Sequence, residues 1–164
     1  MKAVIDTNVL IAANGRDCPQ VTQQCQFSAI KYLETFQKEG MVIVDDKWLI
    51  LKEYQNKVNP KGQPGIGDAF LKWILTNQAN PKRCQKITIT PKDGSFQEFP
   101  DDASLTKFDP SDRKFVAVAL KSPDRPPIIN AVDPDWAECY EALTQLGLTI
   151  EFLCPSIVSP IPNP

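Results

Sequence analysis

The chain has 164 residues, enough for one globular domain with a sizeable core, and its net charge of −2, from 18 basic and 20 acidic residues, argues against a strongly cationic, nonspecific nucleic-acid binder. It contains no histidine, which excludes a Ser-His-Asp triad, a Cys-His dyad and any His-ligated zinc site. Hydrolytic chemistry would therefore depend on carboxylates, lysines or a metal ion held by oxygen ligands.

The first half of the chain predicts two buried strands, each followed by a helix. Unbroken apolar runs at 3–5 and 41–44 end at acidic residues, which is typical of strands buried on both faces. From Val21 to Glu39 apolar residues recur at helical spacing, and Gly40 supplies a stop. We also expect a helix at 47–58, a loop at 61–67 and a helix at 68–77.

The second half predicts three further strands and two helices. Residues 85–90 alternate between apolar and polar, as in a strand, and 92–95 has the composition of a turn. Asp109 is an N-cap candidate, with Pro110 at the first position of a helix that runs to Leu120. Beyond it we expect a strand at 128–132, a helix at 133–146 capped by Gly147, a strand at 148–153 and an extended, Pro-rich tail at 155–164.

Strands that alternate with helices favour an α/β fold, a three-layer α/β/α sandwich around a central, mainly parallel sheet. The apolar runs of the first two strands and of the strand at Ile128 fit a sheet covered on both faces. No internal repeat divides the chain. We therefore predict a single domain over residues 1–154, followed by the tail.

Cysteine usage and apolar run lengths indicate the compartment. The five cysteines include no CxxC pair, and we interpret them as buried, reduced thiols of a cytosolic protein. The first apolar run is too short for a signal-peptide core, and no stretch approaches the ~20 residues of a membrane span. These features predict a cytoplasmic protein without a membrane segment.

Acidic residues follow several of the predicted strands. Asp6 follows the first strand, Asp45 and Asp46 follow the second, and Asp133 and Asp135 follow the strand at Ile128. Ligands of open parallel sheets collect outside the carboxyl ends of the strands, so these side chains are expected near one another. Like charges in one cleft are costly unless a cation neutralises them, and oxygen ligands without His or Cys select Mg²⁺ or Mn²⁺.

Four segments carry a resemblance to PIN-domain nucleases. The run from Val4 to Ile11, with its Asp-Thr-Asn turn, resembles the opening of that family, in which the Asp is the first metal-binding acid. Glu53, in the helix after the second strand, is similar to the second acid, and Asp112, which opens an alanine-rich helix, to the third. The turn at 130–136 resembles the segment of the fourth acid.

The resemblance implies a PIN-like, RNase-H-like fold and Mg²⁺- or Mn²⁺-dependent cleavage of RNA phosphodiester bonds, by an enzyme that acts alone or as the toxin of a toxin–antitoxin pair. It implies that the catalytic, metal-holding residues are Asp6, Glu53, Asp112 and Asp133, and that Asn8 positions a ligand or water. We expect Asp133, which directly follows a strand, to be the nearer ligand. Asp135, in the next helical turn, would orient water.

Two other interpretations stay open. Taken singly, each acid is explained as a turn, cap or solvated residue, although those explanations do not account for four acids in one family's order. A PIN-like module that binds RNA or protein without catalysis is the alternative function. A phosphatase with an Asp nucleophile ranks third. Such enzymes commonly have a second acid two residues after the nucleophile, and here that position is Asn8.

Basic residues near the acids are candidates for binding RNA. Lys52 and Lys57 flank Glu53, and Arg113 and Lys114 directly follow Asp112. A cationic rim around a metal centre suits a phosphate backbone. Among the tryptophans, which could stack bases, Trp73 is expected in the core and Trp136 near the site. The partners predicted are RNA, an antitoxin protein and a second copy of the chain.

Overall fold

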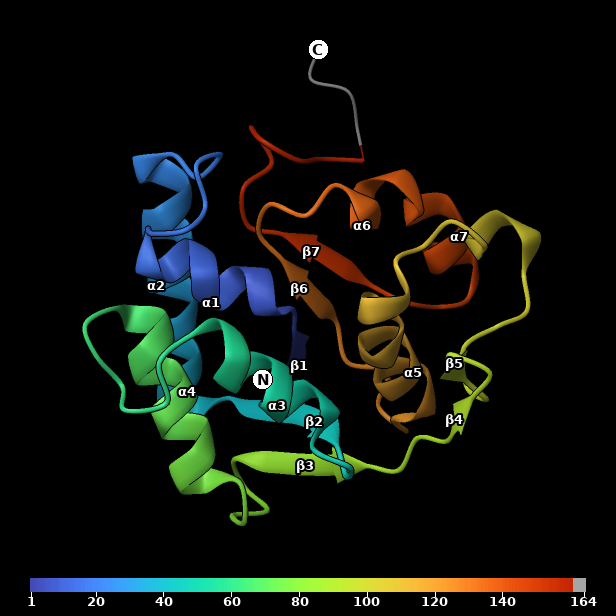
Figure 1. Ribbon diagram of the computed structural model, residues 1–164, viewed down its shortest axis with the longest axis horizontal. Coiled ribbons are helices and arrows are strands. Elements are labelled where there is room, and N and C mark those ends of the chain that lie inside the picture. The colour runs from blue at the N-terminus through green and yellow to red at the C-terminus, as the bar shows by residue number, and fades with distance from the viewer. Residues whose placement is uncertain (161–164) are drawn as a thin grey trace.

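The computed structural model describes residues 1–160 and contains a five-stranded sheet between layers of helices (Figure 1). The strands run in the order β3-β2-β1-β6-β7, and every neighbouring pair is parallel. The predicted α/β/α sandwich is therefore confirmed. The strands of this sheet are β1 (Lys2–Ile5), β2 (Met41–Asp45), β3 (Cys84–Ile87), β6 (Ile128–Asn130) and β7 (Ile150–Phe152).

Helices cover both faces of the sheet. Three of them pack on one another on one side: α1 (Thr7–Asn14), α2 (Gln23–Glu39) and α4 (Ile66–Asn77). On the other side α5 (Arg113–Lys121) packs against β1, β2 and β6 (Figure 1). The remaining elements are the helices α3 (Leu49–Lys57), α6 (Asp135–Glu138) and α7 (Tyr140–Gln145), the 3₁₀ turns η1 (Ala103–Leu105) and η2 (Pro110–Asp112), and the hairpin strands β4 (Pro91–Lys92) and β5 (Ser95–Phe96).

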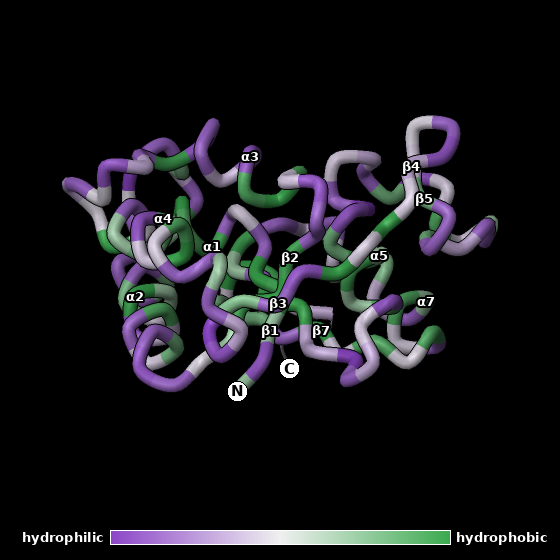
Figure 2. Tube along the Cα trace, turned by 90° about the horizontal axis from the view of Figure 1, so that it is seen from below, coloured by the Kyte–Doolittle hydropathy of each residue, from purple (hydrophilic) through white to green (hydrophobic). Residues whose placement is uncertain are grey.

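The apolar runs of the sequence form the centre of the molecule. Apart from the first residues of β1 and β2, the side chains of β1, β2 and β6 are buried, as in Val4, Ile43 and Ile129. The tube in Figure 2 is mostly hydrophobic at the centre, around β1 and β2, and mostly hydrophilic along the outer loops. Strands buried on both faces need continuous apolar sequence, which is why these runs identify the sheet.

The strand order reverses direction between β1 and β6. From β1 the chain moves outward to β2 and β3, and it then returns to β6 and β7 on the other side. Ile5 of β1 is paired with Ile129 of β6, so the carboxyl ends of the two strands lie side by side. In open α/β sheets the crevice at such a reversal is where ligands bind.

One helix was not predicted. The residues from Thr7 to Asn14 form α1, whereas the sequence suggested a polar turn there. Asp6 caps this helix by accepting a hydrogen bond from the Asn8 N–H at 3.0 Å, and Gly15 ends it at a φ of 69°. Because α1 is packed against both α2 and α4, its sequence is apolar on most sides and lacks a helical period.

Several boundaries also differ from expectation. β3 ends at Ile87, because the Thr88 hydroxyl donates to Asp46 and the chain then leaves the sheet. The predicted helix at 133–146 is interrupted at Cys139 and forms α6 and α7. The described part of the predicted extended tail turns back, with Val158 N–H bonded to the Cys154 carbonyl at 3.0 Å. The rest of that tail, 161–164, lies outside the described residues.

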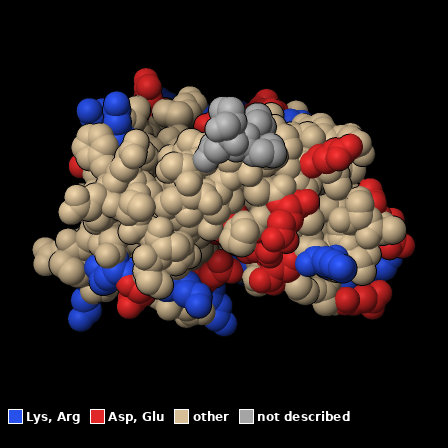
Figure 3. All heavy atoms as spheres, turned by 90° about the horizontal axis from the view of Figure 1, so that it is seen from above, with Lys and Arg blue, Asp and Glu red and all other residues tan. Residues whose placement is uncertain are grey.

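Charge is distributed unevenly over the surface. Residues 126–164 contain five acidic residues and no lysine or arginine. Figure 3 shows acidic side chains gathered mainly on the part of one face that lies over α6 and α7. Any lysine or arginine near these acidic side chains therefore belongs to a segment that precedes β6 in the chain. Across residues 1–160, no helix combines the length and apolarity needed to cross a membrane.

The expectation of five reduced thiols is wrong. Cys25, in α2, forms a disulfide with Cys154, which follows β7, while Cys18, Cys84 and Cys139 are free. The two half-cystines are 129 positions apart, with a Cα–Cα distance of 5.2 Å. Disulfides persist in oxidising compartments, so the pair argues against the reducing environment assumed from the cysteine count. The predicted cytoplasmic location stays a prediction.

Removing this disulfide is expected to lower stability by about 2–4 kcal/mol, because it closes a long loop of the unfolded chain. Cys154→Ser should therefore reduce the melting temperature by about 4–16 °C, measured by circular dichroism without reductant. Cys18→Ser, at a free cysteine, is the matched control and should leave it unchanged. Equal melting temperatures for the wild type and Cys154→Ser would show that the bond does not form.

Candidate metal centre

Three of the four predicted acids meet at the reversal of strand order. Asp6 directly follows β1, Asp133 lies three residues after β6, and Asp112 ends η2 at the start of α5. One carboxylate oxygen of each lies within 4.8 Å of the other two. Asp6 and Asp112 are only 3% and 6% exposed, and Asp133 is half-buried.

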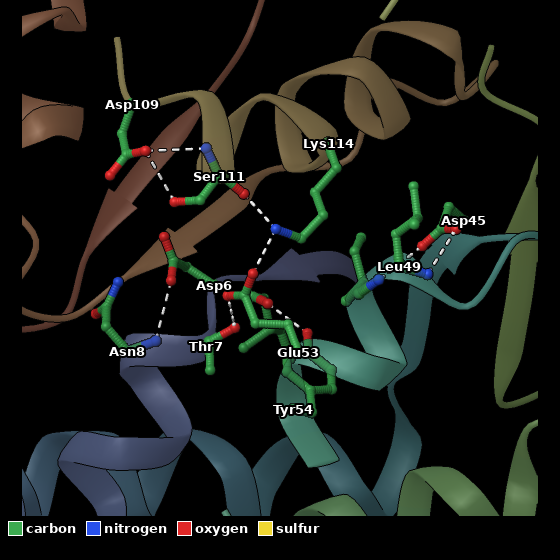
Figure 4. A network of polar contacts seen from close by, with 12 residues as sticks. Asp6, Thr7, Asn8, Asp45, Leu49, Glu53, Tyr54, Asp109, Ser111 and Lys114 are labelled. Carbon is green, nitrogen blue, oxygen red and sulfur yellow. Dashed lines mark hydrogen bonds and ion pairs between the residues drawn. The ribbon is translucent and has the colours of Figure 1, made fainter. Parts of the chain in front are cut away.

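Asp6 is held in place from two directions. Its Oδ1 accepts the Asn8 N–H, the bond that begins α1 (Figure 4). Its Oδ2 accepts the indole N–H of Trp136 at 2.6 Å. Trp136 is fully buried, so it lies beside the site as expected but has no face free to stack a base. Its role is to fix the direction of the Asp6 carboxylate.

Asn8 positions the segment that carries Asp133. Its side-chain oxygen accepts the backbone N–H groups of Ala131 at 2.8 Å and Val132 at 3.0 Å. Its amide nitrogen donates to Asn130 Oδ1 at 2.9 Å, and Asn130 in turn bonds the backbone of Asp133. The predicted ligand-positioning residue thus acts on the protein chain itself, by joining α1 to the turn after β6.

Burial and crowding disfavour the ionised form of these acids. Burial is the main cause that raises the pKa of Asp6 from its ordinary 3.8 to about 7, although the N–H groups of Asn8 and Trp136 oppose the rise. Burial, then the charges of Asp6 and Asp133, raises the pKa of Asp112 to about 9. Near neutral pH the metal-free cluster therefore retains protons that a divalent cation would replace.

Glu53 lies at the edge of this cluster and is already neutralised. Lys114, from α5, forms an ion pair with its Oε2 (Figure 4). The Thr7 hydroxyl donates to its Oε1 at 2.5 Å. Among residues 1–160, neither of the two acidic groups with metal-ligand spacing includes Glu53. The structure therefore places Glu53 beside the three aspartates, with both of its oxygens engaged by the protein.

Asp135 belongs to a second, adjoining group. Its carboxylate, with those of Asp109 and Asp112, forms another set of three within 4.8 Å. Burial is the main cause of its raised pKa, and the charge of Asp133 adds to it. From the sequence Asp109 is expected only to cap a helix, and its side chain does accept the Ser111 N–H at 2.9 Å. The i, i+3 spacing of Asp109 and Asp112 in a helical turn was the signal that could have identified it.

The predicted RNA-binding residues fall into two classes. Lys52 and Lys57 are exposed on α3, so solvent and a phosphate group can reach both. Arg113 bonds the Phe108 carbonyl at 3.2 Å and lies 4.7 Å from the centre of the Phe99 ring, so it holds the segment before α5. Lys114 is only 8% exposed.

Other candidate residues serve the fold. Asp45 is fully buried and accepts the backbone N–H groups of Lys47, Leu49 and Ile50, which begins α3 (Figure 4). It therefore acts as a cap and is not part of the acidic cluster. Trp73 is half-buried in the aromatic packing around Phe70, with ring centres 5.4 Å apart, in keeping with its predicted place in the core.

A pocket opens next to η2 and the first turn of α5, and none of the three aspartates lines it. Its volume is about 480 Å³, and it extends from the β4–β5 hairpin to Ser111 and Lys114. The hairpin packs against α5, so the insertion between β3 and α5 forms a wall of this pocket. The lining residues are Leu49, Pro91, Lys92, Asp93, Gly94, Ser95, Phe96, Pro110, Ser111 and Lys114.

The donor set fits a hard divalent cation. Carboxylate oxygens are the ligands that Mg²⁺ and Mn²⁺ prefer, and the cluster offers no softer ligand. The raised pKa values of Asp6 and Asp112 record how costly it is to ionise these groups together without a cation. Asp6, Asp112 and Asp133 are thus the residues best placed to hold such an ion.

The metal-free protein should become less stable as the pH rises from about 4 to 9. The folded state raises the pKa of Asp6 from 3.8 to about 7 and that of Asp112 from 3.8 to about 9. Their contribution to stability is therefore complete below pH 3.8. It is lost as the pH rises through about 7 for Asp6 and about 9 for Asp112. The lowered pKa of Asp68 acts only in the acid range. Melting curves in EDTA at pH 5, 7 and 9 should show the decline, and Mn²⁺ should reverse it. A flat profile would contradict these shifts.

Asp133→Asn should weaken Mn²⁺ binding more than Asp135→Asn does. Asp133 lies in the group with Asp6, whereas Asp135 reaches the site only through Asp112 and by its own N–H to Asp133 Oδ1, at 2.9 Å. Loss of a residue that acts through a ligand lowers metal affinity by about 10–100-fold, and loss of the ligand itself should lower the affinity more. Calorimetric titration with Mn²⁺ measures both. A larger loss for Asp135→Asn would reverse the assignment.

No protein-family model, curated protein or solved structure matches the chain. The geometry of the site is therefore the basis for a functional conclusion.

Proposed function

We propose that the chain is a Mg²⁺- or Mn²⁺-dependent ribonuclease that hydrolyses RNA phosphodiester bonds. The observation that carries the proposal is the convergence of Asp6, Asp112 and Asp133 within 4.8 Å at the reversal of strand order. Three buried or half-buried carboxylates so close together destabilise the fold unless protons or a cation neutralise them, and a site that is costly to maintain suggests function. The absence of histidine is consistent with chemistry that depends on oxygen ligands.

The residues of the chain have separate tasks in this proposal. The three aspartates hold the ion, Trp136 and the Asn8 N–H fix the orientation of Asp6, and the Asn8 side chain fixes the turn with Asp133. When bound, such an ion activates water and stabilises the leaving oxygen in phosphodiester hydrolysis. The pocket of about 480 Å³, which Ser111 and Lys114 help to line, has room for a nucleotide.

RNA is proposed as the substrate because of the resemblance of four segments to PIN-domain nucleases. Exposed Lys52 on α3 and exposed Lys92, which lines the pocket, offer positive charge. These charges attract a phosphate backbone without reading its sequence. A role as the toxin of a toxin–antitoxin pair is part of the same proposal and follows from the same resemblance.

The test is cleavage of a labelled single-stranded RNA by the purified chain. We expect cleavage with Mg²⁺ or Mn²⁺, none with EDTA, and undiminished cleavage after the partly exposed free thiols of Cys18 and Cys139 are alkylated. Calorimetric titration with Mn²⁺ is done on the same sample. Binding of RNA without cleavage would favour the non-catalytic module, and failure to bind Mn²⁺ would reject the metal centre.

A further inference from the structure

Lys114 is a lysine buried within the acidic site. It projects from the first turn of α5, two residues after Asp112, and its side chain is only 10% exposed. Its ammonium group pairs with Glu53 and donates to the Ser111 carbonyl (Figure 4). It also lies 4.9 Å from the centre of the Phe115 ring. Burial of a lysine is costly, and here the cost is offset by the ion pair and by these contacts.

The pairing changes what Glu53 can do. One Glu53 oxygen bonds Lys114 and the other accepts the Thr7 hydroxyl at 2.5 Å. A divalent ion that approached Glu53 would meet oxygens that already bind the Lys114 ammonium group and the Thr7 hydroxyl, and the ammonium charge would repel it. Glu53 and Lys114 together carry no net charge. The aspartates beside them are the carboxylates that remain for a divalent ion, which would replace their protons.

We propose that Lys114 is a resident cation of the metal centre, which neutralises Glu53 and so withholds this carboxylate from the divalent ion. The inference rests on the proposed function, because it concerns the same centre. It assigns the ion to Asp6, Asp112 and Asp133 and makes Glu53 the counter-charge of Lys114. Lys114 is thus a positioning residue whose partner in the metal-free protein is Glu53.

The same geometry gives Lys114 a place in substrate binding. An ammonium group has three N–H donors, and within residues 1–160 two are used, by Glu53 and by the Ser111 carbonyl. Lys114 also lines the pocket of about 480 Å³. A phosphate oxygen of a substrate in that pocket is the ligand that its third donor fits, since lysine binds phosphate as a point charge.

The experiment measures the Mn²⁺ dissociation constant by calorimetric titration of the metal-free chain and of four variants. Lys114→Met removes the cation and leaves Glu53 with the Thr7 hydroxyl as its remaining partner, and Lys114→Arg retains the charge. The double variant Lys114→Met with Glu53→Gln removes both charges, so it leaves no unpaired charge that could prevent folding. Lys121→Met, at an exposed lysine of the same helix, is the matched control.

We expect Lys114→Met to tighten Mn²⁺ binding about tenfold or more, because a repelling charge is lost and a carboxylate is released. The double variant should bind within about threefold of the wild type, as should Lys114→Arg and Lys121→Met. A double variant that binds more than about threefold more weakly would show that Glu53 is itself a ligand, and would overturn the inference. An unchanged constant for Lys114→Met would also overturn it. If the wild type binds no Mn²⁺, the proposed function itself fails, which distinguishes the two.

Discussion

Asp6→Asn is expected to lower the rate of Mn²⁺-dependent RNA cleavage by about two to four orders of magnitude. The substitution removes a charge from the centre while it keeps the size of the side chain and an oxygen that can still cap α1. The asparagine side chain has one oxygen in place of two, so it can accept the Asn8 N–H or the Trp136 N–H but not both in the same way. One of the two hydrogen bonds that orient residue 6 is therefore lost.

The matched control for that measurement is Asp124→Asn. Asp124 is an exposed aspartate whose ion pair with Lys2 lies at the surface, so its loss should change cleavage by less than about twofold. Circular dichroism establishes that both variants are folded. Cleavage by Asp6→Asn at the wild-type rate would exclude Asp6 from the metal site.

Asp112→Asn is expected to abolish Mn²⁺ binding and at the same time to stabilise the metal-free protein. Burial and the charges of Asp6 and Asp133 raise the pKa of Asp112 to about 9. At pH 8 the aspartate therefore destabilises the folded chain, which must either bind a proton there or hold a repelled charge. Asparagine is neutral and similar in size. At pH 8 we expect a gain of about 2 kcal/mol, which corresponds to about 4–8 °C in melting temperature.

Melting curves of the wild type and of Asp112→Asn, each with EDTA and with Mn²⁺, test this prediction. Mn²⁺ should raise the melting temperature of the wild type and leave that of the variant unchanged, because only the wild type binds the ion. A residue that lowers stability in exchange for function is common at active sites. A variant that is less stable than the wild type in EDTA would show that Asp112 serves the fold instead.

The sheet and the place of the acids were predictable for one physical reason. Strands buried on both faces of a parallel sheet need unbroken apolar runs, and those runs are visible in the sequence at 3–5, 41–44 and 128–132. Because parallel strands end at the same edge, the acids that follow β1 and β6 were expected to meet there, and Asp6 and Asp133 do.

Other features depend on packing that no local pattern records. Helix α1 is covered by α2 and α4, so it lacks the apolar period by which helices are identified. Cys25 and Cys154 are separated by most of the chain, and five cysteines allow many pairings. The pairing of Glu53 with Lys114 requires α3 and α5 to lie side by side, which only the folded sheet brings about.

The most direct test of the metal centre is a crystal structure of the chain soaked in Mn²⁺, with the ion located by its anomalous scattering. The proposal predicts one ion about 2–2.5 Å from carboxylate oxygens of Asp6, Asp112 and Asp133, with Glu53 still paired with Lys114. No ion at these three aspartates under conditions that saturate binding, or an ion bound only elsewhere on the chain, would contradict it.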